Sequence, residues 1–182
     1  MISTILLAAG QSARMKGENK LIKEIDGMPL IKHAVKNILA STVDEIIIVL
    51  GHEKDLIKNT VGVNKKIKFI YNKDFKKGIS YSIKTGLNHV SKKSDAFFIS
   101  LGDMPNVNQN IYNKLIKSRL KYNKKLKPQH KKEIVIPTFK GKHGNPVLFS
   151  KFMKDKVMSV KNDLGANEII KLNKEKILNV PF

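Results

Sequence analysis

The residues best suited to chemistry stand near the amino terminus, directly after a short apolar run. They read Leu7-Ala8-Ala9-Gly10-Gln11-Ser12-Ala13-Arg14-Met15 and are followed by Asn19-Lys20-Leu21. Small residues let backbone N–H groups approach a phosphate or a base closely. Arg14 and Lys20 add two cations that match the charge of a triphosphate. The segment indicates a nucleotide-binding loop or a structural turn rich in small residues, and it matches neither the P-loop nor the dinucleotide fingerprint.

A carboxylate follows a second apolar run, in the segment Gly102-Asp103-Met104-Pro105. Asp103 follows residues 96–101, which read as a buried strand, with only Gly102 between them. A carboxylate in this place can hold Mg²⁺, a hard cation that prefers oxygen ligands and keeps several waters. The alternative is a turn in which Asp103 bonds its own backbone. The presence of the first loop favours the metal site.

Three further segments carry weaker signals, namely Gly78-Ile79-Ser80-Tyr81-Ser82-Ile83, His143-Gly144-Asn145-Pro146 and Asp163-Leu164-Gly165-Ala166-Asn167. Ser80 is a natural helix N-cap, and helix N-termini also attract anions. For Asp163, the sequence favours a role as a helix cap over a role in ligand binding. His143 reads as a surface residue of a turn.

Apolar runs alternate with helical patterns along the chain, which predicts an α/β fold with a three-layer, doubly wound, mostly parallel sheet. Ligands bind such a sheet beyond the carboxyl ends of its strands, where the strand order reverses. Residues 1–182 are expected to form one domain, with residues 121–132 as an exposed loop. Strands are predicted at 3–7, 45–50, 67–71, 96–101, 134–137, 147–149 and 177–180, and helices at 29–39, 53–60, 79–90, 111–120 and 166–172.

The composition bounds the function classes. The 182 residues include no cysteine, which excludes disulfides and thiolate chemistry, and no apolar run reaches the roughly 20 residues that span a bilayer. The apolar start of the chain reads as a buried strand and not as a signal peptide, so a cytoplasmic protein is expected. The net charge is +20, and all of its 35 basic residues except Arg14 and Arg119 are lysine. This composition favours a solvated lysine surface over a nucleic-acid site, which usually relies on arginine.

Taken together, these segments resemble the molybdenum-cofactor nucleotidyltransferase family, and most closely its molybdopterin cytidylyltransferases. The resemblance runs from Ile5 to about Val180 and keeps the motifs in family order. Guanylyl-transferring relatives usually carry a second glycine where Ala9 stands, so the match favours CTP. Methylerythritol-phosphate cytidylyltransferases share the first loop but typically have Pro-Lys where this chain has Asn19-Lys20.

The resemblance implies a role for each motif. The nucleotide would be held by the first loop and by three later polar residues, a set comprising Leu7, Ala8, Ala9, Gly10, Ser12, Asn72, Ser80 and Ser82. Arg14 and Lys20 would bind the phosphates and act in catalysis together with Asp103, which would bind Mg²⁺. Asn145 and Asp163 would face the pterin substrate.

The activity implied is transfer of CMP from CTP to the terminal phosphate of molybdopterin, with release of pyrophosphate. Its partners would be CTP and a molybdopterin-type substrate, with a transient contact to a molybdoenzyme or its chaperone, and with no nucleic acid or membrane. The chain departs from the family at Lys16 and Asn167, and it lacks the usual acidic segment and last helix after residues 177–180. Three alternatives remain: use of GTP, another phosphorylated acceptor such as a sugar phosphate, and a non-catalytic nucleic-acid-binding relative.

Overall fold

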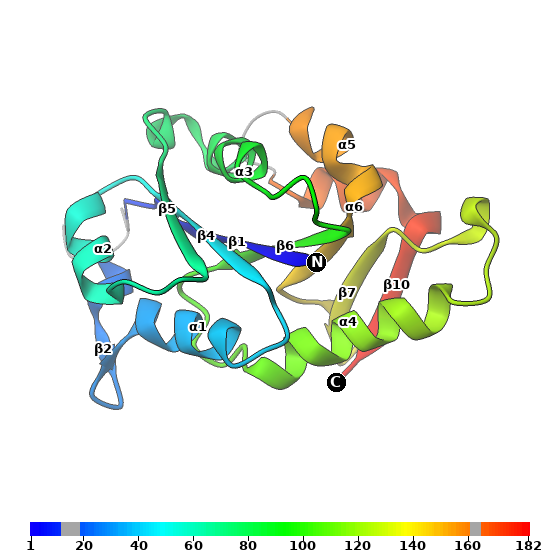
Figure 1. The fold of residues 1–182 in the computed structure, drawn as a ribbon, viewed down its shortest axis with the longest axis horizontal. Helices are drawn as coiled ribbons and strands as arrows, with labels where there is room; N and C mark the ends of the chain where they lie inside the picture. Colours follow the sequence, from blue (N-terminus) through cyan, green and yellow to red (C-terminus); the bar gives the residue numbers. More distant parts are fainter. Residues whose placement is uncertain (12–18, 161–164) are drawn as a thin grey trace.

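An eight-stranded sheet forms the centre of the molecule (Figure 1). The computed structural model describes residues 1–11, 19–160 and 165–182. Seven strands follow the order β10-β7-β9-β6-β1-β4-β5, and β8 pairs with β7 at the side of this path. The strands are β1 (Ile2–Ala8), β4 (Glu45–Leu50), β5 (Ile67–Tyr71), β6 (Ala96–Leu101), β7 (Ile134–Phe139), β8 (Lys142–His143), β9 (Val147–Ser150) and β10 (Ile177–Pro181).

The strand order reverses at β1, as the predicted doubly wound fold requires. β1 pairs in parallel with β4 on one side and with β6 on the other, and β5 extends the parallel set beyond β4. β9 runs antiparallel to both of its neighbours, β6 and β7, while β10 pairs in parallel with β7. The sheet is therefore mixed but mostly parallel, and the carboxyl ends of β1, β4, β5 and β6 meet at one edge.

Helices cover both faces of the sheet (Figure 1). One face carries α1 (Leu30–Leu39), α2 (Lys54–Val61) and α4 (Gln109–Asn123), and the other carries α3 (Ile79–Asn88), α5 (Lys154–Met158) and α6 (Asn167–Leu172). Successive side chains of a strand point to opposite faces, so β1 sends Leu6 to the first layer and Ile5 and Leu7 to the second. A strand that is buried on both faces must be apolar throughout, and this accounts for the continuous runs in the sequence.

Most predicted elements are confirmed to within a few residues, and the differences have local causes. α4 continues to Asn123, so the loop predicted from residue 121 begins later, and it contains the 3₁₀ helix η4 (Pro128–His130). The helix predicted from residue 29 begins at Leu30, because Pro29 ends a hairpin formed by β2 (Glu24–Ile25) and β3 (Met28–Pro29). The remaining 3₁₀ helices are η2 (Lys20–Ile22), η3 (Phe75–Lys77), η5 (Lys151–Met153) and η7 (Lys174–Lys176).

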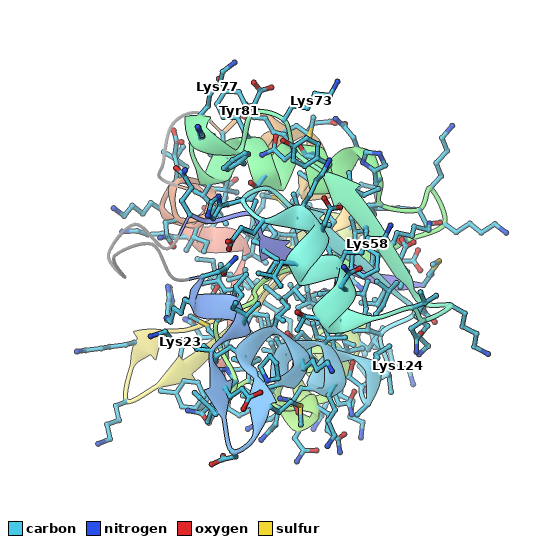
Figure 2. The ribbon with its side chains drawn as sticks, turned by 90° about the vertical axis from the view of Figure 1, so that its left-hand side faces the viewer. Lys23, Lys58, Lys73, Lys77, Tyr81 and Lys124 are labelled. Carbon is cyan, nitrogen blue, oxygen red and sulfur yellow. The ribbon has the colours of Figure 1, made fainter. Side chains whose placement is uncertain are left out.

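The surface carries lysines from many different elements. Figure 2 shows Lys23, Lys58, Lys73, Lys77 and Lys124 projecting outward at separate places around the molecule. Across residues 1–11, 19–160 and 165–182, no helix has both the length and the apolar character needed to cross a membrane.

The buried carboxylate of Glu45 links neighbouring strands where they begin, at the amino-terminal edge of the sheet. Glu45 is 5% exposed and lies opposite Ser3 in the pairing of β4 with β1. Its carboxylate accepts hydrogen bonds from Ser3 Oγ (2.5 Å), from the Ser91 backbone N–H (2.8 Å) and from Lys68 Nζ (3.0 Å). Burial alone would raise the pKa of Glu45, but these hydrogen bonds outweigh it and lower the pKa below its ordinary value.

We expect Glu45→Gln to cost about 1–3 kcal/mol of unfolding free energy near neutral pH, because one oxygen of the carboxylate is replaced by an amide nitrogen that cannot accept a hydrogen bond. The lowered pKa means that the stabilisation is complete above the pKa of the unfolded chain and is lost as pH falls through the folded value. Urea unfolding of both proteins near pH 7 and near pH 3 measures this, and the gap between them should shrink in acid. Asp26→Asn, in the exposed hairpin turn, is the control and should change little. An equal gap at both pH values would contradict the assignment.

Candidate nucleotide site

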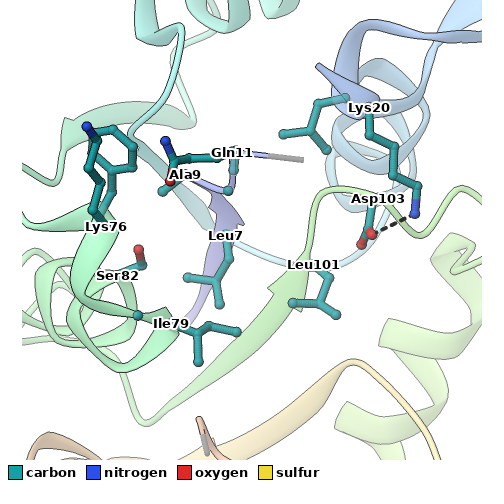
Figure 3. Close-up of a pocket in the computed structure, with 14 residues that line it drawn as sticks. Leu7, Ala9, Gln11, Lys20, Lys76, Ile79, Ser82, Leu101 and Asp103 are labelled. Atoms are coloured by element: carbon teal, nitrogen blue, oxygen red, sulfur yellow. Dashed lines mark hydrogen bonds and ion pairs between the residues drawn. The ribbon is translucent and has the colours of Figure 1, made fainter. Parts of the chain in front are cut away.

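A cavity of about 360 Å³ opens at the carboxyl edge of the sheet, beyond β1 and β6 (Figure 3). The end of β1 forms its floor, η2 and Asp103, two residues beyond β6, form one end, and the start of α3 forms the other. Fourteen of the described residues line it, namely Leu7, Ala8, Ala9, Gly10, Gln11, Lys20, Leu21, Phe75, Lys76, Gly78, Ile79, Ser82, Leu101 and Asp103. Gly10, Lys20 and Asp103, which follow two different strands, thus line the same cavity at the edge where ligands were expected to bind.

Lys20 and Asp103 form an ion pair at one end of the cavity. Lys20 Nζ lies 2.9 Å from Asp103 Oδ2, although the two residues are 83 positions apart (Figure 3). Lys20 opens η2, a turn that Asn19 caps by accepting a hydrogen bond from the Leu21 N–H at 3.0 Å. Asp103 is held next to β1 because the N–H of the preceding Gly102 donates to the Leu7 carbonyl at 3.0 Å. The pair places a positive charge and a carboxylate at the same point.

The chain is tightly packed just beyond the ends of β4 and β6, where two glycines stand. A Cβ at Gly51, directly after β4, would lie 2.6 Å from the Ala9 carbonyl oxygen and 2.7 Å from Cβ of Phe75. A Cβ at Gly102 would lie 2.9 Å from a methyl carbon of Ile31. Close packing therefore requires a glycine at position 51, whereas the contact at Gly102 is with the end of a flexible side chain that can shift.

Asn72 orients Ser82 at the other end of the cavity. The Asn72 side chain is 3% exposed, and its Oδ1 accepts a hydrogen bond from the Asp74 N–H at 3.0 Å. Its Nδ2 consequently faces Ser82 Oγ, to which it donates at 3.0 Å. Since Ser82 Oγ accepts this bond, its own hydrogen is left to donate. Ser82 lines the cavity, and Asn72 stands behind it.

Ser80 is not the N-cap of α3, so that prediction is wrong. The cap residue is Gly78, whose φ of 113° lets the chain turn sharply into the helix. Ser80 lies within the first turn, is 1% exposed and does not line the cavity. In the described segments its Oγ has no hydrogen-bond partner. Its role in nucleotide binding stays a prediction.

The remaining predicted residues stand apart from the cavity or lie outside the described residues. Asn145 is half-buried and precedes β9, whose first residue pairs with Ile99 of β6, but it does not line the cavity. Its neighbour His143 contacts Asn179, with Nε2 3.0 Å from the amide oxygen. Ser12, Arg14 and Asp163 lie outside the described residues.

A family model described as MobA-like NTP transferase domain matches residues 4–177, nearly the whole chain. The chain belongs to this MobA-like NTP transferase family. The family level of the resemblance found in the sequence is thereby confirmed.

Curated relatives share part of this domain. The Bifunctional protein GlmU of Staphylococcus epidermidis is 29% identical over 113 residues, which cover 62% of this chain and 24% of that protein. Its counterpart in Staphylococcus saprophyticus is 28% identical over 102 residues, which cover 56% of this chain and 22% of that protein. The match therefore spans about a quarter of the length of these relatives.

Solved structures share the fold over the full chain. Rv0371c of Mycobacterium tuberculosis superposes with a TM-score of 0.83 at 17% identity, covering 100% of this chain and 87% of that one, and its complex with manganese gives 0.78 at 15% identity, covering 100% and 88%. The 4-diphosphocytidyl-2C-methyl-D-erythritol synthase of Anaerococcus prevotii superposes with a TM-score of 0.75 at 19% identity. The superposition covers 99% of this chain and 86% of that one. A CMP:2-keto-3-deoxy-manno-octonic acid synthetase complexed with CTP superposes with a TM-score of 0.71 at 12% identity. The superposition covers 100% of this chain and 90% of that one.

Several lining residues of this MobA-like domain were not predicted as site residues. Phe75 and Lys76 belong to η3, a short turn between the buried Asn72 and the predicted Gly78 segment. The sequence signal for them is their position between two predicted motifs. Gln11 and Leu21 line the cavity directly beside predicted residues.

Asp103 can hold a hard divalent cation only if a bound substrate supplies further oxygen ligands. Within residues 1–11, 19–160 and 165–182 no three His, Asp or Glu side chains gather as a metal site, and Asp103 is the one carboxylate among the lining residues. Asp103 Oδ2 faces Lys20, and the Asp103 side chain is 38% exposed, so a cation can reach it from the cavity. Mg²⁺ is commonly bound by one or two carboxylates together with substrate phosphates and water. Asp103 fits that mode of binding.

The two glycines at the cavity wall should respond differently to an added methyl group. We expect Gly51→Ala to cost about 1–3 kcal/mol of stability, because the new Cβ overlaps the Ala9 carbonyl and Phe75. Gly10→Ala is the matched control, since none of the described atoms lies within 4 Å of the place that a Cβ would take there. Urea unfolding should show a loss only for Gly51→Ala. Equal stability of the two variants would contradict the close packing.

Proposed function

We propose that this protein is a nucleotidyltransferase that transfers CMP from CTP to the terminal phosphate of molybdopterin or a closely related phosphorylated compound. The observation that carries the proposal is a single cavity with the Lys20–Asp103 pair at one end and an uncharged hydroxyl, Ser82, toward the other (Figure 3). That arrangement suits a molecule with a charged triphosphate and a polar base. Membership of the NTP transferase family supports the same reading.

In the proposed reaction, an oxygen of the acceptor phosphate attacks the α-phosphorus of CTP. The bond from the α-phosphorus to the bridging oxygen breaks, and pyrophosphate leaves with the electron pair. The attacking phosphate is largely ionised near pH 7, because the second pKa of a phosphomonoester is about 6. The protein therefore does not need a general base, and its task is to align two anions and to offset their charge.

Lys20 and Asp103 divide that task. The Lys20 ammonium donates to phosphate oxygens and stabilises the negative charge that builds on the leaving group. Asp103 would hold Mg²⁺ or a similar divalent cation, which when bound neutralises phosphate charge. The manganese complex of Rv0371c is consistent with a divalent cation in this fold. Arg14, predicted to assist Lys20, remains part of the proposal.

The preference for CTP is supported by the other end of the cavity. Ser82 has a hydroxyl hydrogen free to donate, and cytosine offers the acceptors O2 and N3 along its edge. Ala9 and Gly10 add no bulky side chain there, so the backbone can approach the base. The relatives whose titles name CTP or diphosphocytidyl chemistry are consistent with this choice.

A second candidate differs in the acceptor alone. Structural relatives include a 4-diphosphocytidyl-2C-methyl-D-erythritol synthase and an inositol-1-phosphate CTP transferase, whose titles name acceptors or products other than a pterin. The described cavity accounts for the nucleotide and leaves the acceptor open, since Asn145 lies outside its lining. Pyrophosphate release from CTP, measured with molybdopterin and with sugar or polyol phosphates, separates the two candidates. Release that is faster with molybdopterin supports the first, and inertness toward molybdopterin overturns it.

We expect Lys20→Met and Asp103→Ala each to lower kcat by about 10²–10³-fold or more, because each removes charge stabilisation of the reacting phosphates. The assay is pyrophosphate release from CTP with saturating Mg²⁺ and acceptor. Lys65→Met, on an exposed loop before β5, is the control for loss of one lysine and should keep normal turnover. Near-normal turnover of Asp103→Ala in the presence of Mg²⁺ would rule out its metal role.

The orientation of Ser82 by Asn72 gives a separate prediction. Asn72→Asp should raise the Kd for CTP about tenfold, because the new carboxylate accepts the Ser82 hydroxyl hydrogen and withdraws it from the cavity. Ser82→Ala removes the same donor and should have a similar effect. Calorimetric titration of both single variants and of the double variant measures the coupling. If Asn72 acts through Ser82, Asn72→Asp adds little in the Ser82→Ala background, whereas fully additive losses would refute that path.

A further inference from the structure

A second hollow lies behind the proposed base end of the nucleotide cavity. It measures about 390 Å³ and is formed by the end of β4, the start of α2 and the end of β5. Its lining residues are Gly51, His52, Glu53, Lys54, Asp55, Leu56, Tyr71 and Phe75. Among the described lining residues, Phe75 alone is shared by this hollow and the nucleotide cavity, so it contributes to the wall of each.

Close packing fixes the position of Phe75. A Cβ added at Gly51 would lie 2.7 Å from both Cβ and Cγ of Phe75, which shows that the β4 end presses against the base of this side chain. On its other side, Phe75 belongs to η3, and the preceding turn is held by the hydrogen bond from the Asp74 N–H to Asn72. The Gly51 contact therefore fixes the base of the Phe75 side chain, and the hydrogen bond at Asp74 fixes the turn that leads to it.

The charged residues of the cavity determine which part of a bound nucleotide would contact Phe75. Lys20 and Asp103 attract the phosphates and the cation to one end of the cavity, and Figure 3 shows Ser82 and Lys76 on the side away from that pair. The base would accordingly extend past Ser82 toward Phe75. A purine has a second fused ring and is longer than a pyrimidine along this direction.

We propose that Phe75 sets the size limit for the nucleobase, admitting a pyrimidine and excluding a purine. This inference rests on the proposed function, since it assumes that the cavity binds a nucleoside triphosphate. Removing the ring would join the nucleotide cavity to the hollow beside Tyr71 and create the space that a second base ring needs. Selectivity would then come from the shape of the cavity wall in addition to the hydrogen bond from Ser82.

The test compares the binding of CTP and GTP by calorimetric titration in the presence of Mg²⁺. In the unmodified protein CTP should bind at least tenfold more tightly than GTP. Phe75→Ala should reduce that ratio by tenfold or more, mainly through tighter binding of GTP. Phe75→Leu, which keeps an apolar side chain against Gly51, should give an intermediate ratio and serves if Phe75→Ala does not fold. Tyr71→Ala is the matched control, because Tyr71 lines the outer hollow but not the nucleotide cavity.

The outcomes separate this inference from the proposed function. An unchanged CTP-to-GTP ratio in both Phe75 variants, or an equal change in Tyr71→Ala, overturns the role of Phe75. Tighter binding of GTP than of CTP by the unmodified protein also overturns it. A shift of the binding ratio confined to the Phe75 variants supports the inference even where no acceptor is turned over, and that failure of turnover would count against the proposed reaction alone.

Discussion

The parallel pairing of β1 with β4 and β6 is the constraint on which the rest of the structure depends. It brings three carboxyl ends together so closely that Gly51, the residue just beyond β4, has no room for a side chain beside the Ala9 carbonyl, and Gly102 beyond β6 lies in a similarly crowded place. The backbone hydrogen bond from Gly102 to Leu7 then places Asp103 beside the loop that leads to Lys20. The cavity is thus a product of backbone geometry first and of side-chain chemistry second.

Buried amide side chains support the polar residues that line the cavity. Asn72 is fixed by the backbone of Asp74, and it in turn fixes the polarity of Ser82, which reaches the cavity. At the other end, Asn19 shapes the turn that displays Lys20. In both places a buried amide outside the cavity lining determines how a lining residue is oriented, and such supporting residues hold a site to the geometry that it needs.

The sequence was sufficient for the fold and for placing Lys20 and Asp103 at the same edge of the sheet, because continuous apolar runs mark buried parallel strands and ligand sites lie beyond their carboxyl ends. The ion pair between the two residues was found only in the structure. It was not sufficient where tertiary contacts decide. Phe75 is an ordinary aromatic residue in sequence and becomes a wall only because the β4 end presses on it. Ser80 has the right type for a cap, yet the positive φ of Gly78 gives that position to the glycine. The hairpin before α1 escapes prediction because its strands are only two residues long.

Glu45 and the ligand cavity lie at opposite edges of the same sheet, since Glu45 begins β4 and Gly51 follows its end. The hydrogen bonds of Glu45 and the cavity therefore lie at opposite ends of the strands, roughly 15–20 Å apart for a strand of this length. Substitutions that adapt the protein to heat or acid can accumulate around Glu45 without disturbing the cavity. Substitutions around Glu45 and substitutions at the cavity thus affect opposite ends of the strands, so a change at one end leaves the packing at the other intact.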